Sequence, residues 1–329
     1  MRILVTGAAG MVGRKLTERL VLDGSLGGAP IDRLTLADVV PPLVPDEPAF
    51  GVAVVEVDVA DPRDADTLVA DRPDVVFHLA AVVSGEAEAD FEKGYRVNLD
   101  GTRLLLEAIR ADQRYCPRLV FASTIAVFGG PFPDEIGEDF HATPLTSYGT
   151  QKAVCELLLN DYTRRGFVDA VGIRLPTICV RPGAPNLAAS GFFSGIIREP
   201  LNGREAVLPV PADVRHWHAS PRAAVEFLLR AATIDGAALG TRRSLTMPGV
   251  SVTVGEQIDA LAAVAGDEVA QLVRYEPDES VQRVVADWPQ TFDATRAETL
   301  GFRAESSFEE IIRIYVDDEL GGRIPAVTE

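Results

Sequence analysis

A tyrosine and a lysine four residues apart could act together as an acid–base pair. Tyr148 and Lys152 lie in the segment SYGTQK, where helical spacing places both side chains on one face. A free phenol has a pKa of about 10, too high for a base near neutral pH, but a neighbouring ammonium group stabilises the phenolate and lowers that pKa. The pair therefore predicts a tyrosine base assisted by a lysine. Taken alone, the two side chains could equally lie on the helix without a catalytic role.

Two hydroxyl side chains come shortly before this pair. Ser123 and Thr124 directly follow the apolar segment 118–122, RLVFA, which we expect to be a strand. Ligands of parallel sheets bind at the carboxyl ends of the strands. We therefore expect Thr124 or Ser123 to hold the reacting oxygen of a substrate against Tyr148, and we take these three residues and Lys152 as the catalytic set.

A glycine-rich loop lies near the N-terminus. Residues 6–13 read TGAAGMVG, between the apolar segment 2–6 and a helical pattern. In this setting Gly7 permits a tight turn, Gly10 lets the backbone approach a pyrophosphate, and Gly13 lets helix and strand pack closely. The phosphates would meet the free amides and the positive dipole end of the helix. The loop predicts a dinucleotide site, with an ordinary strand–helix turn as the alternative.

Two acids could complete a dinucleotide site. Asp38 ends the second expected strand, where a carboxylate accepts hydrogen bonds from both ribose hydroxyls and repels a 2′-phosphate. This position favours NAD over NADP. Asp38 lies farther from the glycines than is usual because segment 23–32 resembles an inserted loop, and a plain surface acid is the alternative. Asp58, after the third expected strand, could reach the adenine or only cap the strand end.

These residues need a scaffold that brings strand ends together. Segments 11–22, 97–110 and 147–164 have helical spacing. Between them, short apolar segments rich in Val, Ile and Leu predict strands at 2–6, 33–37, 52–57, 74–80, 118–122 and 169–175. Continuous apolar strands that alternate with helices indicate an α/β fold, a doubly wound parallel sheet of the Rossmann type.

The pattern changes after about residue 178. Segment 181–215 is rich in Gly, Pro and Asn, and we expect it to form loops. Ser220 followed by a proline predicts a helix over 221–232. Thr253 and Glu256 have the spacing of a capping box and predict a further helix.

The change of pattern suggests two structural parts. We expect residues 1–178 to form a NAD-binding Rossmann domain, completed by elements within 216–250. The segments 179–215 and 251–329 are expected to form a smaller substrate-binding part that is interleaved with the last strands of the sheet.

The overall charge limits the classes of partner. The chain has 329 residues, with 31 Lys and Arg against 49 Asp and Glu, a formal net charge of −18. This excess of acid argues against binding to nucleic acid or to an anionic membrane surface. An anionic substrate would then need local Arg or Lys side chains.

Targeting signals and cysteine motifs are not evident. No apolar run reaches the roughly 20 residues that span a bilayer, and the start MRILVTG has no apolar region of a signal peptide. We therefore expect a cytoplasmic protein. Cys116, Cys155 and Cys179 are scattered without paired spacing, which predicts neither a disulfide framework nor a zinc site.

Several motifs in order resemble a known family. These are TGAAGMVG, the HLAA at 78–81, NLDGT at 98–102, Ser-Thr before VFG, and Tyr-x-x-x-Lys. The chain resembles the extended short-chain dehydrogenase/reductases, in their nucleotide-sugar epimerase-like branch. The resemblance implies Tyr148 as general acid/base and NAD as cofactor. The NAD-binding residues that it implies are Gly7, Gly10, Met11, Val12, Gly13, Asp38, Asp58, Val59, Leu79, Ala80, Ala81, Asn98, Tyr148, Lys152, Pro176 and Thr177.

Within this family, the residues around the site favour a dehydrogenase. Dehydratases carry an acidic pair after the catalytic Thr, whereas Thr124 is followed by Ile and Ala. Epimerases commonly show an Arg-Asp-aromatic-x-His pattern, but residues 215–218 read RHWH. Segments 190–203, 215–221, 245–257 and 287–302 resemble the D-erythronate dehydrogenase subgroup, which oxidises carbon 2 of a four-carbon sugar acid. A nucleotide-sugar epimerase and a non-catalytic NAD-sensing regulator are the alternatives; the regulator typically lacks the Tyr or Lys.

A small anionic sugar acid needs a cation for its carboxylate. Arg215 is the first candidate, and Arg174 and Arg181 follow because they lie at or beyond a strand end. A salt bridge to one of the many acids is the alternative for each. The expected substrate-binding set is Ser123, Thr124, Tyr148, Arg174, Arg181, Phe192 and Arg215.

Metal binding and assembly complete the expectations. His78 lies in the HLAA segment and is expected to be structural, and His216 and His218 have no third ligand at metal spacing, so we expect no metal site. Related enzymes commonly form homodimers through the helices that correspond to 98–110 and 148–164, and the resemblance implies the same here.

Overall fold

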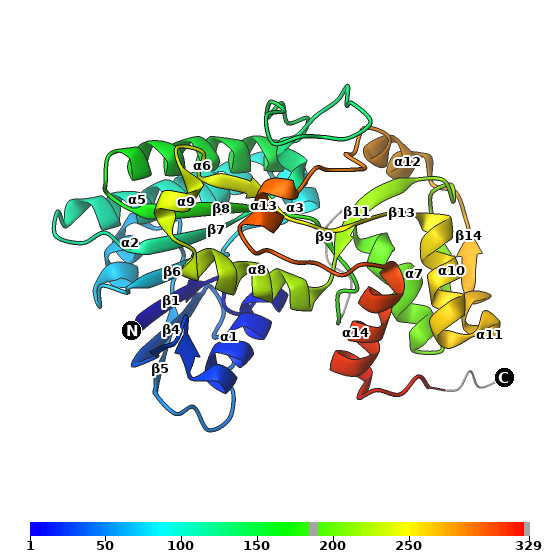
Figure 1. The fold of residues 1–329 in the computed structure, drawn as a ribbon, viewed down its shortest axis with the longest axis horizontal. Coiled ribbons are helices and arrows are strands. Elements are labelled where there is room, and N and C mark those ends of the chain that lie inside the picture. Colours follow the sequence, from blue (N-terminus) through cyan, green and yellow to red (C-terminus); the bar gives the residue numbers. More distant parts are fainter. Residues whose placement is uncertain (184–189, 326–329) are drawn as a thin grey trace.

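The computed structural model describes residues 1–183 and 190–325. Its centre is a seven-stranded sheet in which every neighbouring pair is parallel (Figure 1). In spatial order its strands are β12 (Ser244–Thr246), β8 (Asp169–Leu175), β7 (Arg118–Thr124), β6 (Val75–His78), β1 (Arg2–Thr6), β4 (Arg33–Asp38) and β5 (Gly51–Glu56). This confirms the doubly wound Rossmann-type sheet expected from the sequence.

The strand order reverses at β1. From β1 the chain builds β4 and β5 on one side, and it then crosses to β6, β7 and β8 on the other. Ligands of such sheets bind in the crevice at the carboxyl ends of the strands beside this reversal. The residues after β1, β4, β6 and β7 are therefore brought to one edge.

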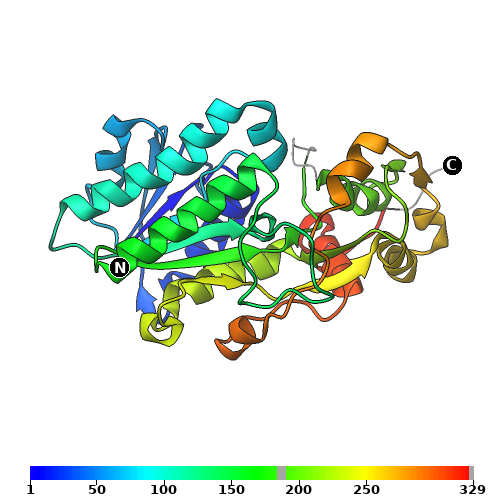
Figure 2. The ribbon, with the colours of Figure 1, turned by 90° about the horizontal axis from the view of Figure 1, so that it is seen from above.

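Helices cover both faces of the sheet (Figures 1 and 2). Helices α1 (Met11–Asp23) and α8 (Pro221–Thr233) pack on one face through apolar side chains such as Leu16 and Phe227. Helices α2 (Pro62–Val69), α5 (Gly101–Ala111) and α6 (Ser147–Arg164) cover the other face, with Leu106 and Leu159 in its core. Strands covered on both faces read as continuous apolar runs, which is why the sequence revealed them.

The helix ends follow their capping residues. The Ser220 side chain accepts a hydrogen bond from Ala223 N at the start of α8. Thr253 and Glu256 form the expected capping box of α10 (Val254–Ala265). Segment 97–110 was expected to be one helix, but a π-helix over Tyr95–Asp100 precedes α5.

A second group of elements packs beside the sheet, on the right of Figure 1. It includes α7 (Gly191–Leu201), α10, α11 (Asp267–Ala270), α12 (Glu279–Val285), α14 (Phe308–Leu320), and two small sheets, β13 (Val250–Thr253) with β11 (Arg215–Ala219) and β9 (Thr177–Ile178), and β10 (Ala206–Leu208) with β14 (Val273–Tyr275). These elements share a second core that contains Phe193, Ile197, Leu261 and Ile312.

The path of the chain interleaves the two groups. Strand β12 joins the large sheet after the chain has passed through β11. Ala297 in α13 (Thr295–Thr299) and Phe302 pack into the core beneath α1 and α8. The division of the chain at residues 178 and 250 stays a prediction.

The expectation of loops throughout 181–215 was wrong. Residues 191–201 form α7, and residues 206–208 form β10. The two glycines and the proline of GFFSGIIREPL have low helix propensity. The helix nevertheless forms because Phe193, Ile196, Ile197 and Leu201 are fully buried along one face, and Pro200 falls in its last turn.

The remaining elements are short. They are the hairpin β2 (Ser25–Leu26) and β3 (Ala29–Pro30), helices α3 (Ser84–Ala89), α4 (Phe91–Gly94) and α9 (Gly236–Leu239), and a 3₁₀ turn over Ile125–Val127. The hairpin lies inside the insert that separates Asp38 from the glycine loop. In residues 1–183 and 190–325, no helix has the length and apolar character needed to cross a membrane.

Candidate active site

Two of the three loop glycines are required by the backbone around them. Gly7 has φ +73°, and a Cβ there would lie 2.6 Å from Ala80 N. A Cβ on Gly13 would lie 2.2 Å from the Gly7 carbonyl oxygen. A Cβ on Gly10 would meet only the Gly7 oxygen, at 3.3 Å, so the protein itself leaves room there. The loop is thus a cradle at the N-terminus of α1, with Met11 and Val12 in its first turn, and it fits a pyrophosphate.

Asp38 lies against this cradle. Ala9 N donates to Asp38 Oδ2 at 2.9 Å, and Val39 N donates to Oδ1 at 2.7 Å. Each carboxylate oxygen can accept further hydrogen bonds. The inserted hairpin therefore does not displace Asp38 from the place where a ribose acid is expected.

The carboxylate of Asp58 accepts hydrogen bonds from the protein itself. Arg96 Nη1 donates to its Oδ2 at 2.6 Å, and Ala60 N donates to Oδ1 at 2.9 Å. Burial of the carboxyl opposes its charge, but the hydrogen bonds from Arg96 and Ala60 hold its pKa below the usual value. Asp58 therefore has protein partners beyond the end of β5, and its role at the adenine stays a prediction. Its neighbour Val59 is buried against Gly101.

The residues after β6 form the wall opposite the glycine loop. Leu79 N donates to the Thr6 carbonyl at 3.1 Å, which holds Leu79, Ala80 and Ala81 beside Gly7. This close approach places the expected HLAA residues at the cradle.

His78 has a structural network of its own. Its Nδ1 lies 2.8 Å from Thr6 Oγ1, and its Nε2 lies 3.0 Å from Thr102 Oγ1. Because Thr102 donates to the Asn98 carbonyl, Nε2 must carry the proton and Nδ1 must accept. Complete burial lowers the pKa of His78 to about 3. Among the residues described, no cluster of three His, Cys, Asp or Glu side chains could hold a metal ion.

Asn98 faces inward from the π-helix. Its Oδ1 accepts from Val82 N at 2.9 Å, and its Nδ2 donates to Gln151 Oε1 at 2.7 Å. The side chain is 1% exposed. Asn98 therefore positions the segment after β6 against helix α6, behind the cradle.

Tyr148 and Lys152 lie on α6 beside the end of β7. Lys152 Nζ donates to the Ala122 carbonyl at 2.9 Å and lies 4.5 Å from the Phe121 ring centre. Burial lowers the pKa of Lys152 to about 8. The Thr124 hydroxyl acts to lower the pKa of the Tyr148 phenol, so the two side chains are neighbours.

A second cation, besides Lys152, acts on the Tyr148 phenol. Loss of water around Tyr148 raises its pKa to about 12, whereas the charge of Arg181 and the hydroxyl of Thr124 act to lower it. Lys152 Nζ is 5.9 Å from the ring centre of Tyr148. Arg181 therefore lies close enough to influence the reacting group.

Ser123 and Arg174 are both held by Glu156, an acid outside the expected set of site residues. Ser123 Oγ donates to Glu156 Oε1 at 2.5 Å, and Arg174 Nη2 donates to Glu156 Oε2 at 2.8 Å. Their side chains thus face α6. Glu156 could have been found, because it follows Lys152 by four residues and Tyr148 by eight on the same helix face.

The other two arginines differ in their partners. Arg215 donates to the Ser251 carbonyl at 2.9 Å and lies 3.1 Å from Glu256. Arg181 Nε donates to the Ile178 carbonyl at 3.0 Å, and its Nη2 donates to Ser190 Oγ at 2.6 Å. Within the described ranges no carboxylate lies at ion-pair distance from Arg181.

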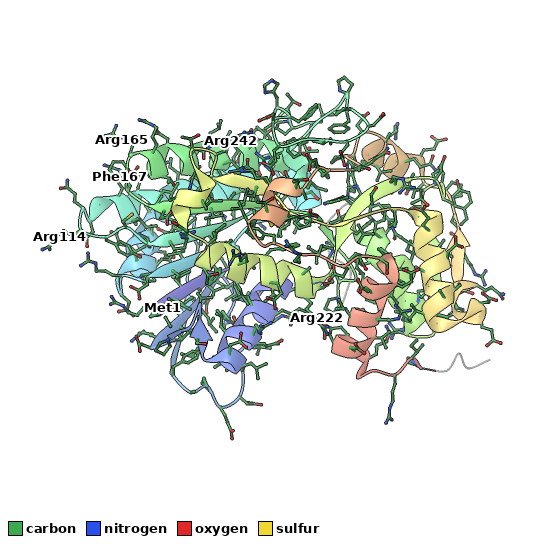
Figure 3. All side chains as sticks on the ribbon, in the orientation of Figure 1. Met1, Arg114, Arg165, Phe167, Arg222 and Arg242 are labelled. Atoms are coloured by element: carbon green, nitrogen blue, oxygen red, sulfur yellow. The ribbon has the colours of Figure 1, made fainter. Side chains whose placement is uncertain are left out.

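Arg181 differs from the arginines at the surface. Arg114, Arg165, Arg222 and Arg242 are exposed (Figure 3), and two of them pair with acids, Arg222 with Asp318 and Arg242 with Asp139. Arg181 is partly buried, and burial lowers its pKa. A guanidinium in such a place is suited to an anionic ligand.

The remaining expected residues line the start of the second group of elements. Thr177 directly follows the buried Pro176, and its Oγ1 lies 2.7 Å from His216 Nε2. Phe192 is partly buried and packs on Phe193, with ring centres 4.1 Å apart. The fold thus brings β9 and the first turn of α7 toward the end of the sheet.

Comparison with known proteins agrees with this geometry. The sequence pattern of the NAD dependent epimerase/dehydratase family matches residues 3–220. The chain belongs to this family. NAD, the cofactor expected from the loop and Asp38, is the cofactor in the family's name.

Two curated relatives cover nearly the whole chain. A protein of Cupriavidus necator, named D-erythronate dehydrogenase, is 48% identical over 97% of this chain and 98% of its own length. A protein of Haemophilus influenzae with the same name is 40% identical over 97% of this chain and all of its own length.

Solved structures share the fold. A crystal structure described as the nucleoside-diphosphate-sugar epimerase from Agrobacterium tumefaciens is 61% identical, with a TM-score of 0.96, and covers 99% of this chain and 96% of its own. The L-threonine 3-dehydrogenase of Trypanosoma brucei has a TM-score of 0.85 at 24% identity, with 99% of each chain covered, which shows the fold alone.

Proposed function

We propose that the chain is an NAD-dependent dehydrogenase that oxidises the C2 hydroxyl of D-erythronate to 2-dehydro-D-erythronate. Two relatives that align along nearly their whole length are named D-erythronate dehydrogenase. The observation in the site that carries the proposal is Arg181, a partly buried guanidinium without an acidic partner among the described residues, whose charge acts on Tyr148. A sugar acid supplies the carboxylate that this cation lacks.

The glycine-loop cradle would hold the cofactor. The glycine loop and the N-terminus of α1 would bind the pyrophosphate, and Asp38 would accept hydrogen bonds from the adenosine ribose. Lys152, which reaches the end of β7, would hold the nicotinamide ribose. When NAD is bound, its nicotinamide ring supplies the acceptor of a hydride.

Thr124 and Tyr148 would handle the proton of the C2 hydroxyl. Thr124 and Tyr148 hold the C2 hydroxyl between them, and Tyr148 Oη takes its proton while the C2–H bond breaks and its electron pair leaves with the hydrogen. The C2–O bond becomes a carbonyl. D-erythronate and NAD⁺ thus give 2-dehydro-D-erythronate, NADH and one proton, which Tyr148 returns to solvent.

Positive charge around the phenol makes this transfer possible. In the free protein the pKa of Tyr148 is raised to about 12, so its phenolate is scarce at neutral pH. The ammonium of Lys152 and the guanidinium of Arg181 both favour the phenolate. Arg181 also takes the substrate carboxylate, whereas Arg174 is paired with Glu156 and Arg215 with Glu256.

Substitution of the arginines tests this assignment. Breaking a buried charge pair typically costs 2–5 kcal/mol, roughly 30-fold or more in affinity. Arg181→Gln should therefore raise KM for D-erythronate at least 30-fold and leave the Kd of NAD within about threefold of wild type. Arg215→Gln is the matched control and should change both constants less than threefold. Equal losses in the two variants would contradict the role of Arg181.

A substrate panel tests the reaction class. NADH formation, followed by absorbance, should be fastest with D-erythronate among four- and five-carbon sugar acids. Erythritol, the neutral counterpart, should react at least 30-fold less efficiently in kcat/KM because it has no carboxylate for Arg181. Faster turnover of erythritol would sink the proposal.

A nucleotide-sugar epimerase is the second candidate. It is favoured by the description of the Agrobacterium tumefaciens structure at 61% identity. An epimerase would interconvert a UDP-sugar without net formation of NADH. Chromatography of UDP-glucose incubated with the protein separates the two functions, since only an epimerase changes the sugar. The pairing of Arg215 with Glu256 weighs against a diphosphate at that arginine.

We also propose that the chain forms a homodimer through α5 and α6. The two helices lie side by side on one face of the sheet (Figures 1 and 2). Leu157 on α6 is 68% exposed, and Leu145 just before it is 63% exposed. The mass of one chain is 35.3 kDa. Size-exclusion chromatography with light scattering should give twice this mass.

A further inference from the structure

Three consecutive residues at the end of β7 face three residues of α6. Ala122 accepts a hydrogen bond from Lys152 Nζ at 2.9 Å, Ser123 Oγ donates to Glu156 Oε1 at 2.5 Å, and Thr124 lies close enough to Tyr148 to act on the pKa of its phenol. The three helix residues are four positions apart, so they form one stripe along α6. Tyr148 and Lys152 have roles in the proposed reaction, but Glu156 has none so far.

Glu156 also reaches the neighbouring strand. Arg174 Nε lies 3.0 and 3.1 Å from the two carboxylate oxygens, and its Nη2 donates to Oε2 at 2.8 Å. Ser123 and Arg174 are register partners on β7 and β8. Glu156, which is 5% exposed, therefore joins the ends of β7 and β8 to helix α6.

We propose that Glu156 is a positioning residue for the dehydrogenase reaction: it fixes the end of β7 against α6, and so the gap between Thr124 and Tyr148. Its negative charge also stabilises the ammonium of Lys152. The inference rests on the proposed function, because it assigns Glu156 to the site whose base is Tyr148.

The stabilisation of the Lys152 ammonium can be traced to Glu156 from the groups around it. Burial lowers the pKa of Lys152, and the carboxylate of Glu156 on α6 acts to raise it. His78 on β6 is neutral because burial lowers its pKa to about 3, and burial raises the pKa of the Cys155 thiol, which is therefore also neutral. Glu156 is thus the carboxylate that supports the ammonium of Lys152, with its own charge partly balanced by Arg174.

Stability alone is a weak reason for such a pair. Burying two charges costs solvation that their attraction barely repays, and well-packed apolar residues of similar volume are often as stable. The Glu156–Arg174 pair has side chains only 6% and 12% exposed. Its location at the ends of β7 and β8, rather than deeper in the core, agrees with a role in placing Thr124.

Glu156→Gln tests the proposal. It should lower kcat for D-erythronate at least tenfold while the Kd of NAD stays within threefold of wild type. Loss of the negative charge lowers the pKa of Lys152, so the alkaline limb of the kcat–pH profile should move at least half a unit to lower pH. The matched control is Glu107→Gln on α5, where the carboxylate also accepts from an arginine and from Tyr162 but lies away from the site. Its kcat and pH profile should be those of wild type.

A folded Glu156→Gln that keeps kcat within threefold, or that loses activity with an unshifted pH profile, overturns the inference. If this variant does not fold, Ser123→Ala decides, because it leaves the Glu156–Arg174 pair intact and removes only the tie to β7. We expect it to lower kcat at least threefold with little change in KM, and an unchanged kcat overturns the proposal. If the wild-type protein oxidises no sugar acid, the proposed function is wrong. That outcome is distinct from a failure of the Glu156 inference, which is judged on the variants.

Discussion

At the scale of single residues, the site depends on which charges the protein neutralises for itself. Arg174 and Arg215 each have a carboxylate partner, whereas Arg181 has only hydroxyl and carbonyl acceptors in the part of the chain that is described. Burial raises the pKa of Tyr148 to about 12 and lowers that of Lys152 to about 8. The same loss of water that makes Tyr148 a poor base in the free protein strengthens its response to each added positive charge.

The Tyr148 hydroxyl should be the general base. Tyr148→Phe removes only this oxygen and keeps the ring beside Lys152, so NAD should bind with a Kd within about threefold of wild type. A positioned base typically contributes a factor of about 10² or more, and kcat for D-erythronate should fall by at least that factor. Steady-state kinetics together with NAD titration measure the two effects. Near-normal turnover would move the base to another residue.

At the scale of elements, the site is built where strand ends meet helix starts. The loop after β1 leads into α1, and the end of β7 is tied to α6 by Lys152 and Glu156. Gly13 sits where α1 crosses the glycine loop, with no room for a methyl group. The closeness of this crossing decides whether the free amides of α1 point at a bound phosphate.

Gly13→Ala should therefore disturb both fold and cofactor binding. Its Cβ would lie 2.2 Å from a backbone oxygen, and overpacking of this kind costs about 1–3 kcal/mol. We expect a lower unfolding midpoint and at least tenfold weaker NAD binding. Gly195→Ala is the matched control, because Gly195 lies within α7 with nothing within 4 Å of its Cβ position. Helix propensity should make that variant more stable by up to about 1 kcal/mol, and a parallel loss in both variants would contradict the argument.

At the scale of the whole molecule, three of the four histidines are buried as neutral rings. His78 and His216 have pKa values lowered to about 3 and about 4 by burial, and burial also holds the pKa of His218 well below its ordinary value. His216 Nδ1 lies 3.0 Å from the Pro289 carbonyl, which fixes its tautomer. The three rings lie in both groups of elements, so their protonation acts on the whole fold.

Stability should fall as the pH drops below about 6.5. An unfolded histidine binds a proton near that pH, whereas these folded ones do not until about pH 4 or below. The unfolded state then binds more protons, so the free energy of unfolding decreases with acidification, by about 1 kcal/mol per histidine for each pH unit. Urea titrations at pH 7.5, 6.5 and 5.5 in 0.15 M salt measure this slope. A flat stability between pH 6.5 and 5.5 would contradict the burial of neutral histidines.

Much of the fold, and the proposal for the cofactor site, followed from local pattern. Continuous apolar strands, the spacing of the loop glycines, the residue Asp38 at a strand end, and the Tyr148–Lys152 pair all depend on neighbours within a few turns of chain. Such short-range periods and caps are written directly in the sequence. The order of the motifs then identified the family. The helix α7 was missed because its propensity is poor and burial of one face overrides it.

The partners of the charged side chains were decided only by the tertiary structure. Arg174 meets Glu156 across 18 residues and Arg215 meets Glu256 across 41, and nothing local distinguishes them from Arg181. Whether an arginine is neutralised depends on which acid the packing of distant elements brings within hydrogen-bond reach. Types and spacings were therefore enough to predict a Rossmann fold with a tyrosine base. The choice of the cation for a carboxylate, and the tie of Glu156 to β7, required the folded arrangement.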